Sequence, residues 1–321
     1  MAKGMHVGIS GVARKASKIY VGIGGVARKV KKIYVGIEGI ARLVWSGDYK
    51  IIEILNSSKP YTAQNSMKAA AGPYIYMFGG VNNGTYYNYL YRYNINTQAW
   101  TQLTGDIGVA DGALEAVGND LYRFGGRASG SGNSLNHNHK YNTLTDTWET
   151  KTALPYLSNG HATAVIGTDI YVNGGYNNGT VLSSYYKYNT LTDTWTQLQA
   201  NIRRYYHSLV AVNGLIYIFG GYFNASVDPQ DSQYVYNPTT NTWTQLASAP
   251  YPIAGHTAIV IGTEVHVFGG LAPADSANNS KRHWKYDILT NAWTILDNLV
   301  NNIYGLGSKA LWASDDIYLI G

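Results

Sequence analysis

The stretch YIYMFGG at residues 74–80 decides how this chain folds, because it recurs along the sequence. Its copies read LYRFGG at 121–126, IYVNGG at 170–175, IYIFGG at 216–221, VHVFGG at 265–270 and IYLIG at 317–321. The first glycines of successive copies are 46, 49, 46, 49 and 52 residues apart. A period of this length predicts an array of repeated supersecondary units.

A second pattern has the same period. Five tyrosines are each followed seven positions later by a tryptophan: Tyr93 and Trp100, Tyr141 and Trp148, Tyr188 and Trp195, Tyr236 and Trp243, and Tyr286 and Trp293. The residues between them, such as NTLTDT at 142–147, predict a tight turn held by side-chain hydrogen bonds to the backbone. With the hairpin signal Asn213-Gly214, each unit is predicted to hold four strands. Such sheets bury both faces when they stack radially in a propeller.

The Gly-Gly and Tyr-x6-Trp motifs resemble kelch repeats over about residues 60–321. The resemblance implies an all-β fold, a six-bladed kelch-type β-propeller. The sixth blade is expected to be incomplete, because there are six first-and-second strand pairs but five third-and-fourth pairs. Either DYKIIEIL at 48–55 helps to close the ring, or the natural chain continues past Gly321, which is the alternative we favour. Kelch propellers serve as enzymes, adaptors and lectin-like binders, so the fold alone does not give a function.

The N-terminal residues carry a second, shorter repeat. VGISGVARKASKIY at 7–20 is followed by VGIGGVARKVKKIY at 21–34 and by VGIEGIARLVW at 35–45, a period of 14 residues. Alternating β-branched residues on either side of a glycine turn predict a small β-hairpin repeat module. We therefore expect the module at residues 1–47, a linker strand at 48–60 and the propeller at 61–321.

Charge is distributed unevenly between these parts. Residues 1–50 hold ten Lys and Arg and two acids, for +8, whereas residues 51–321 hold 14 basic and 17 acidic residues, for −3. The basic side chains of the module are expected to form a solvated face rather than a polyanion-binding patch, because few aromatics accompany them. They are Arg14, Lys15, Lys18, Arg28, Lys29, Lys31 and Lys32.

The N-terminal repeat resembles modules in structural proteins of tailed bacteriophages and prophages. The resemblance implies a virion part, such as a neck, collar or tail appendage, and no chemistry. We expect this module to contact other virion proteins and the protein to be a homo-oligomer on the particle. The chain has no apolar stretch long enough for a transmembrane helix and no secretory signal, so no membrane insertion is expected.

Few residues suggest catalysis or metal binding. The chain has no cysteine, which excludes disulfides, thiolate metal sites and cysteine nucleophiles. His161, His207 and His256 share one position of the repeat, 13 residues before the first glycine, which favours a structural role. His137 and His139 lie in a loop without a nearby carboxylate, a weak metal signal. We therefore predict no catalytic residues, no metal and no cofactor.

Residues that break the repeat are better candidates for a site. The connection before the first strand of the fourth unit reads Arg203-Arg204-Tyr205-Tyr206, where other units have no arginine pair. This connection and the long loops between second and third strands lie at the same end of a four-stranded blade. Guanidinium groups suit carboxylates or phosphates, and aromatic faces suit sugar rings. The predicted ligand-binding residues are Arg203, Arg204, Tyr205, Tyr206, Tyr222, Tyr156 and Tyr304.

The sequence thus predicts a bacteriophage virion protein whose propeller attaches to a glycan or protein of the host surface, with carbohydrate favoured as the ligand. Two alternatives are a kelch-type sugar-processing enzyme, such as a sialic-acid mutarotase, and an adaptor for protein or nucleic acid. We expect at least one of the two arginines to face the axial opening of the propeller.

Overall fold

The computed structural model describes residues 20–23, 26–29, 33–37, 40–45, 51–54, 59–128, 133–200, 202–224, 228–271, 281–299, 309–313 and 316–320. The chain forms two compact units, residues 1–49 and 50–321, which we describe separately. The described residues are strands and their connections, with no helix long and apolar enough to cross a membrane.

The described residues of the first unit form two antiparallel strand pairs. β1 (Tyr20–Ile23) pairs with β2 (Val26–Lys29), and β3 (Ile33–Ile37) pairs with β4 (Ile40–Trp45). These strands match the second and third copies of the 14-residue repeat. The first copy lies almost wholly outside the described residues, so the three-copy module remains a prediction.

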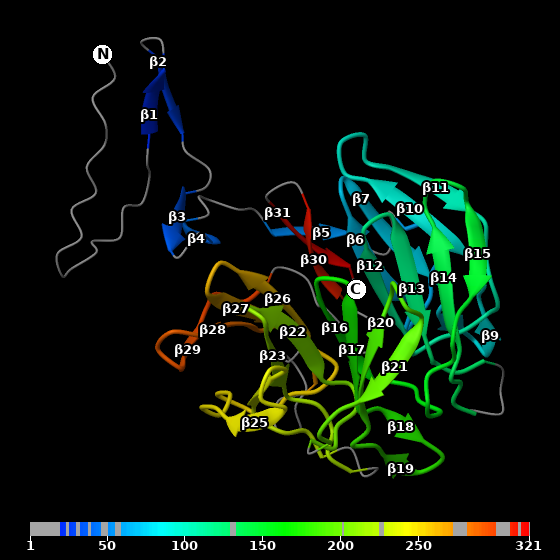
Figure 1. The fold of residues 1–321 in the computed structure, drawn as a ribbon. Helices are drawn as coiled ribbons and strands as arrows, with labels where there is room; N and C mark the ends of the chain where they lie inside the picture. The colour runs from blue at the N-terminus through cyan, green and yellow to red at the C-terminus, as the bar shows by residue number, and fades with distance from the viewer. Residues whose placement is uncertain are drawn as a thin grey trace. The chain divides into compact units, whose positions relative to one another are not determined.

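The described residues of the second unit form five four-stranded antiparallel sheets, which we call blades 1 to 5 (Figure 1). Blade 1 contains β6 (Met67–Ala71), β7 (Tyr74–Phe78), β10 (Leu90–Asn94) and β11 (Ala99–Leu103). Blade 2 contains β12 (Ala113–Val117), β13 (Asp120–Phe124), β14 (Asn138–Asn142) and β15 (Thr147–Thr150). Blade 3 contains β16 (Ala162–Ile166), β17 (Asp169–Asn173), β20 (Tyr185–Asn189) and β21 (Thr194–Gln197).

Blade 4 contains β22 (Ser208–Val212), β23 (Leu215–Phe219), β24 (Tyr234–Asn237) and β25 (Thr242–Gln245). Blade 5 contains β26 (Thr257–Ile261), β27 (Glu264–Phe268), β28 (His283–Asp287) and β29 (Ala292–Ile295). Two short hairpins lie in second-to-third-strand loops: β8 (Val81–Asn82) with β9 (Thr85–Tyr86), and β18 (Tyr176–Asn177) with β19 (Thr180–Val181).

The structure corrects the predicted six blades to five four-stranded blades among the described residues. The remaining sheet has three strands: β30 (Lys309–Ala313), β31 (Asp316–Ile320) and β5 (Ile51–Ile54). β5 pairs parallel with β31, so DYKIIEIL does supply a strand to this sheet. β30 contacts the first strands of blades 5 and 1, so the six first strands form a closed ring.

The Tyr-x6-Trp motif acts as the sequence predicts. In each blade its tyrosine and tryptophan lie opposite each other on the third and fourth strands, as in Tyr141 and Trp148, whose rings are 5.1 Å apart. Asn142 Oδ1 accepts hydrogen bonds from the backbone N–H groups of Leu144 and Thr145, which confirms the predicted turn. Large aromatic rings paired in this way supply the apolar surface between blades.

The paired glycines are required by close packing between neighbouring blades. Gly220 has φ +55, and a Cβ added there would lie 2.3 Å from the Ile253 carbonyl oxygen and 2.8 Å from Cε1 of His256 in the next blade. Gly221 has φ +90 and would place a Cβ 2.6 Å from Cβ of His207. Each histidine of the shared repeat position therefore packs against glycines, which supports its structural interpretation.

Candidate ligand-binding site

Arg203 and Phe223 form the most exposed part of the predicted site. The Arg203 guanidinium lies over the Phe223 ring, 4.8 Å from its centroid, and Phe223 is 40% exposed. Both residues line a hollow of about 280 Å³ with Gly179, Thr180, Val181 and Asn224. Within the described part of the chain, no carboxylate forms an ion pair with Arg203. A cation stacked on an aromatic face can still offer its N–H groups to an anion.

Arg204 lies beneath this surface instead. It is buried, its Nη1 donates to the Arg203 carbonyl oxygen at 2.9 Å, and its Nη2 donates to Ser232 Oγ at 2.6 Å. Its guanidinium also lies 5.6 Å from the Phe223 ring. Burial lowers the pKa of Arg204. Arg204 therefore supports the loop from below, while Arg203 is available at the surface.

Three of the predicted tyrosines form one cluster. Tyr205, Tyr206 and Tyr222 have ring centroids 5.1–6.4 Å apart, and Tyr176 joins them 5.3 Å from Tyr205. Tyr205 and Tyr222 are buried and also pair through their backbones. This cluster packs the loops of blades 3 and 4 together rather than presenting open aromatic faces.

Tyr206 connects this cluster to the centre of the propeller. Its hydroxyl donates to Asp111 Oδ1 at 2.9 Å, and Asp111 Oδ2 accepts from Arg127 Nε at 2.5 Å. Burial, reinforced by the Asp111 charge, raises the pKa of Tyr206. Burial acts to lower the pKa of Arg127, but the Asp111 carboxylate outweighs it, so that pKa is raised. These three side chains join blades 2 and 4.

The backbone of Tyr206 takes part in a chain of hydrogen bonds between blades. Its N–H donates to the Gly160 carbonyl at 2.8 Å, and its carbonyl accepts from Gly255 N at 2.8 Å. The chain continues from Gly160 N to the Asp111 carbonyl and from Asp111 N to the Asn65 carbonyl. All five residues have positive φ, 52° in Tyr206. Tyrosine is unusual in this conformation, which glycine, asparagine and aspartate adopt more readily.

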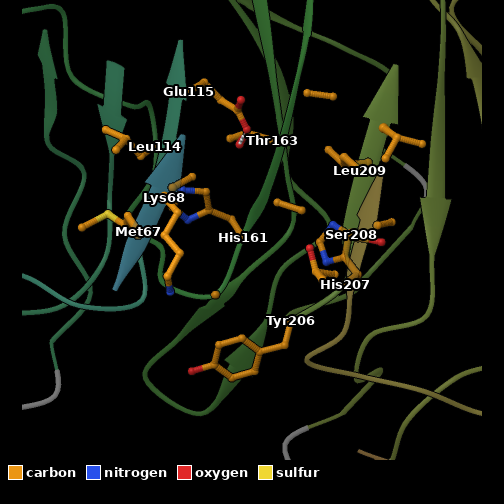
Figure 2. Close-up of a pocket in the computed structure, with 18 of the residues that line it drawn as sticks. Met67, Lys68, Leu114, Glu115, His161, Thr163, Tyr206, His207, Ser208 and Leu209 are labelled. Carbon is orange, nitrogen blue, oxygen red and sulfur yellow. Dashed lines mark hydrogen bonds between the residues drawn. The ribbon is translucent and has the colours of Figure 1, made fainter. Parts of the chain in front are cut away.

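A cavity of about 370 Å³ lies inside the ring of first strands. Figure 2 shows the side chains of Lys68, Glu115, His161 and His207 around it, with Tyr206 at one end. Glu115 Oε1 accepts a hydrogen bond from Thr163 Oγ1 at 2.6 Å. Neither Arg203 nor Arg204 lines this cavity, so the expectation that one of them faces the axial opening is wrong.

The three histidines of the shared repeat position border this cavity as buried, neutral groups. Burial lowers the pKa of His161 and His256 to about 4 and that of His207 well below its ordinary value. His256 Nε2 lies 2.8 Å from Ser208 Oγ. No group of three or more potential metal ligands occurs in the described ranges.

The other predicted residues lie apart or cannot be placed. Tyr156 packs against the core between blades 2 and 3, with its ring 5.5 Å from Tyr186, and burial raises its pKa. Tyr304 lies outside the described residues. The structure therefore brings Arg203, Arg204, Tyr205, Tyr206 and Tyr222 together and places Tyr156 elsewhere.

The sequence analysis did not include three residues that contact the predicted site residues: Phe223, Asp111 and Arg127. Phe223 directly follows Tyr222, and a loop aromatic near an arginine pair was a signal that could have been used. Asp111 lies two residues before the first strand of blade 2, as Tyr206 does before that of blade 4, but no sequence pattern relates a side chain in blade 2 to one in blade 4.

A second ionic cluster lies between blades 1 and 2. Asp106 Oδ2 accepts from Arg123 Nη2 at 2.6 Å and lies 2.6 Å from His139 Nδ1. Burial would raise the pKa of Asp106, but the hydrogen bond with His139 and the charge of Arg123 outweigh it, so the pKa is lowered. His139 therefore has a carboxylate partner that sequence reasoning did not find, and the partner is shared with an arginine.

Comparison with known proteins agrees with this architecture. Residues 111–321 match the family model described as the KLHDC2/KLHL20/DRC7 Kelch-repeats domain, and residues 69–105 match the Kelch motif. Kelch domain-containing protein 10 of Homo sapiens is 31% identical over 183 residues, 52% of this chain and 41% of that protein. Kelch-like protein 23 of Pongo abelii is 28% identical over 194 residues, 58% of this chain and 34% of that protein.

The chain thus spans less than half the length of these relatives. The solved structure of YjhT has a TM-score of 0.71 and 17% identity, over 82% of this chain and 91% of that one, which shows a shared fold. The two family models match residues 69–105 and 111–321, which do not include the N-terminal repeat. Because the family model covers more than half of the residues and the blades carry its motifs, this chain belongs to the Kelch-repeats domain family.

Proposed function

We propose that the propeller binds an acidic carbohydrate through the surface hollow around Arg203 and Phe223. The observation that supports this most is the exposed Arg203 guanidinium, which is stacked on a partly exposed aromatic ring at the edge of a hollow of about 280 Å³. A carboxylate on the ligand would bind the guanidinium, and a sugar ring would pack on Phe223. Thr180 and Asn224 supply polar groups at the rim.

The setting that we propose is attachment of a virion to its host. The support is the resemblance of the N-terminal repeat to modules of tailed-bacteriophage and prophage structural proteins. In this proposal residues 1–47 hold the protein, as a homo-oligomer, on other virion proteins. The propeller then presents the hollow around Arg203 and Phe223 to the host ligand. The three-stranded sheet of β30, β31 and β5 takes the place of the predicted sixth blade.

Replacing Arg203 by alanine should weaken binding to host cells or acidic glycans by about 1–3 kcal/mol, because a charge-assisted hydrogen bond is lost. The measurement is the binding of purified protein to an array of neutral and acidic glycans. Arg203→Lys should recover part of the affinity for acidic glycans. Arg92→Ala is the matched control, since Arg92 stacks on Tyr74 in blade 1, 4.5 Å from its ring centroid, and should leave binding unchanged. Equal binding by Arg203→Ala and the parent protein would remove the basis of the proposal.

The sugar-processing alternative has its own support in the central cavity. Glu115 and three neutral histidines border a volume of about 370 Å³, which is within the range of small-molecule pockets. Incubation of the protein with sialic acid and other reducing sugars, followed by NMR of the anomeric protons, separates the two functions. Accelerated interconversion that survives Arg203→Ala would favour an enzyme over attachment.

A further inference from the structure

One end of the central cavity is surrounded by residues that share a repeat position, which we call the rim. Each lies two residues before the first strand of its blade, and each lines the cavity. The residue before each of them forms a β-bridge with the residue that follows the Gly-Gly pair, so the rim lies at the end that carries the long loops. The rim residues are Asn65, Asp111, Gly160, Tyr206 and Gly255.

Tyr206 has the largest side chain of the rim and is the residue least suited to its backbone conformation. The other four rim residues are asparagine, aspartate or glycine, which adopt positive φ readily. Tyr206 has φ +52, which is strained for a bulky side chain. Strain of this kind is concentrated at sites where it serves a function. The conformation of Tyr206 therefore favours a task for its ring that a smaller side chain could not perform.

The Tyr206 side chain crosses the rim from blade 4 to blade 2. A Cβ added to Gly160 of blade 3 would lie 3.0–3.3 Å from three atoms of the tyrosine ring, so the ring lies directly over this glycine. Beyond Gly160, the Tyr206 hydroxyl donates to Asp111 Oδ1, and the other oxygen of Asp111 accepts from Arg127 Nε. Figure 2 shows Tyr206 at one end of the cavity. One side chain thus spans three neighbouring blades at the loop end of the cavity.

The central cavity contains neutral polar groups that need a hydrogen-bonding guest. Both ring nitrogens of His207 and the hydroxyl of Ser66 are buried without a hydrogen-bond partner among the described residues, and both residues line the cavity. Burial keeps His207 neutral by lowering its pKa, so its ring can donate one hydrogen bond and accept another. The charged side chains of Glu115 and Lys68 already have partners, a threonine hydroxyl and the Ser66 carbonyl oxygen. The cavity is therefore suited to water or a small uncharged polar molecule.

We propose that Tyr206 is a latched bar across the loop end of the central cavity, which admits small uncharged molecules from that end only when its hydrogen bond to Asp111 breaks. The latch is the Tyr206 hydroxyl on the Asp111 carboxylate, which Arg127 holds from the other side. With the latch formed, the ring over Gly160 separates the cavity from the surface that carries the loops. Tyr206 thereby determines which molecules reach the cavity from this end. This proposal is independent of the glycan site.

Modification of His207 by diethyl pyrocarbonate tests the bar, because this small uncharged reagent reacts with neutral imidazoles. The full chain is treated at pH 7, and the modified peptides are quantified by mass spectrometry. Tyr206→Phe keeps the ring but loses the latch and should raise the rate at His207 about fivefold, the change expected for one hydrogen bond. Tyr206→Gly also removes the ring and should raise the rate further. His139, which is partly exposed and does not line the cavity, is the internal reference and should react equally in all proteins.

Asn65→Gly is the matched control. It places glycine at the same rim position of blade 1, where the backbone also has positive φ, and should leave the rate at His207 unchanged. Tyr206→Asn is a second test of ring removal, since asparagine occupies this position in blade 1, and urea denaturation shows that each variant is folded. Equal rates at His207 in the parent protein, Tyr206→Phe and Tyr206→Gly would overturn the proposal. So would an increase in Asn65→Gly as large as that in Tyr206→Gly, or a rate at His207 of the parent protein that matches His139.

Discussion

Replacing Gly220 by alanine should destabilise the propeller by about 2–5 kcal/mol. Two effects add at this position. A side chain at φ +55 costs roughly 1–2 kcal/mol, and the new Cβ would lie 2.3 Å from the Ile253 carbonyl oxygen, which forces a shift between blades 4 and 5 that costs roughly 1–3 kcal/mol. The free energy of unfolding, measured by urea denaturation at neutral pH, tests this value.

Gly214 provides the matched control. It lies in the Asn213-Gly214 turn with φ +78, and a Cβ added there would meet no atom within 4 Å. Gly214→Ala should therefore lower the free energy of unfolding only by the cost of a side chain at positive φ, roughly 1–2 kcal/mol. If the two variants are equally destabilised, the close approach of blades 4 and 5 contributes nothing, and our explanation of the paired glycines is wrong.

Acidification from pH 7 to pH 4 should destabilise the protein by several kcal/mol through its buried histidines. The pKa of His161 and His256 is about 4 in the folded protein, compared with about 6.5 for an unfolded histidine. Between these values the unfolded state binds more protons. The stability that these histidines contribute is therefore fully present above pH 6.5 and is lost as the pH falls towards 4. Each of the two histidines contributes on the order of 3 kcal/mol over this window.

Carboxylates change the free energy of unfolding at lower pH than the histidines do, so the two contributions can be measured separately. The pKa of Asp193 is lowered, since burial is outweighed by hydrogen bonds from Tyr188 and Thr152. The contribution of Asp193 to the free energy of unfolding is therefore present above the ordinary aspartate pKa and is lost only below about pH 4. Urea midpoints at pH 7, 5.5 and 4.5 consequently report mainly on the histidines.

His256→Ser tests the assignment, because Ser66 has the same repeat position in blade 1. The variant should be less stable than the parent protein at pH 7, since a buried ring is lost. Its stability should also fall less steeply between pH 7 and 4.5. A parallel pH dependence in the two proteins would show that His256 does not titrate in this window.

Local motifs predicted most of the propeller because the contacts they encode recur in every blade. The register of Tyr141 with Trp148 and the turn at Asn142 follow from short-range spacing. The parallel pairing of β5 with β31 could not be predicted, since an alternating apolar strand fits either direction.

The sequence singled out the arginine pair of the candidate site but neither Phe223 nor the geometry around it. The Arg203–Arg204 pair stood out against the other repeats, yet which arginine is exposed depends on Phe223 and Ser232, which come from the following blade. Contacts between non-adjacent blades, such as Tyr206 with Asp111, have no counterpart in the repeat and so leave no periodic signal.

Neighbouring blades share a recurrent pair of hydrogen bonds, which bears on how the ring comes apart. Between blades 1 and 2, the backbone N–H of Thr104 donates to Asp146 Oδ1 and Trp148 Nε1 donates to the Thr104 carbonyl oxygen, both at 2.9 Å, and equivalent pairs join blades 2 and 3, 3 and 4, and 4 and 5. Each pair joins only adjacent blades, so these bonds couple each blade to its neighbours, while the hydrogen bond from Tyr206 to Asp111 adds coupling between blades 2 and 4. Blades 2 to 5 are each fastened by their own tryptophan to the blade before, whereas Trp100 has no such bond within the described ranges. Loss of one pair is therefore expected to loosen the two blades that it joins before it affects the rest of the ring.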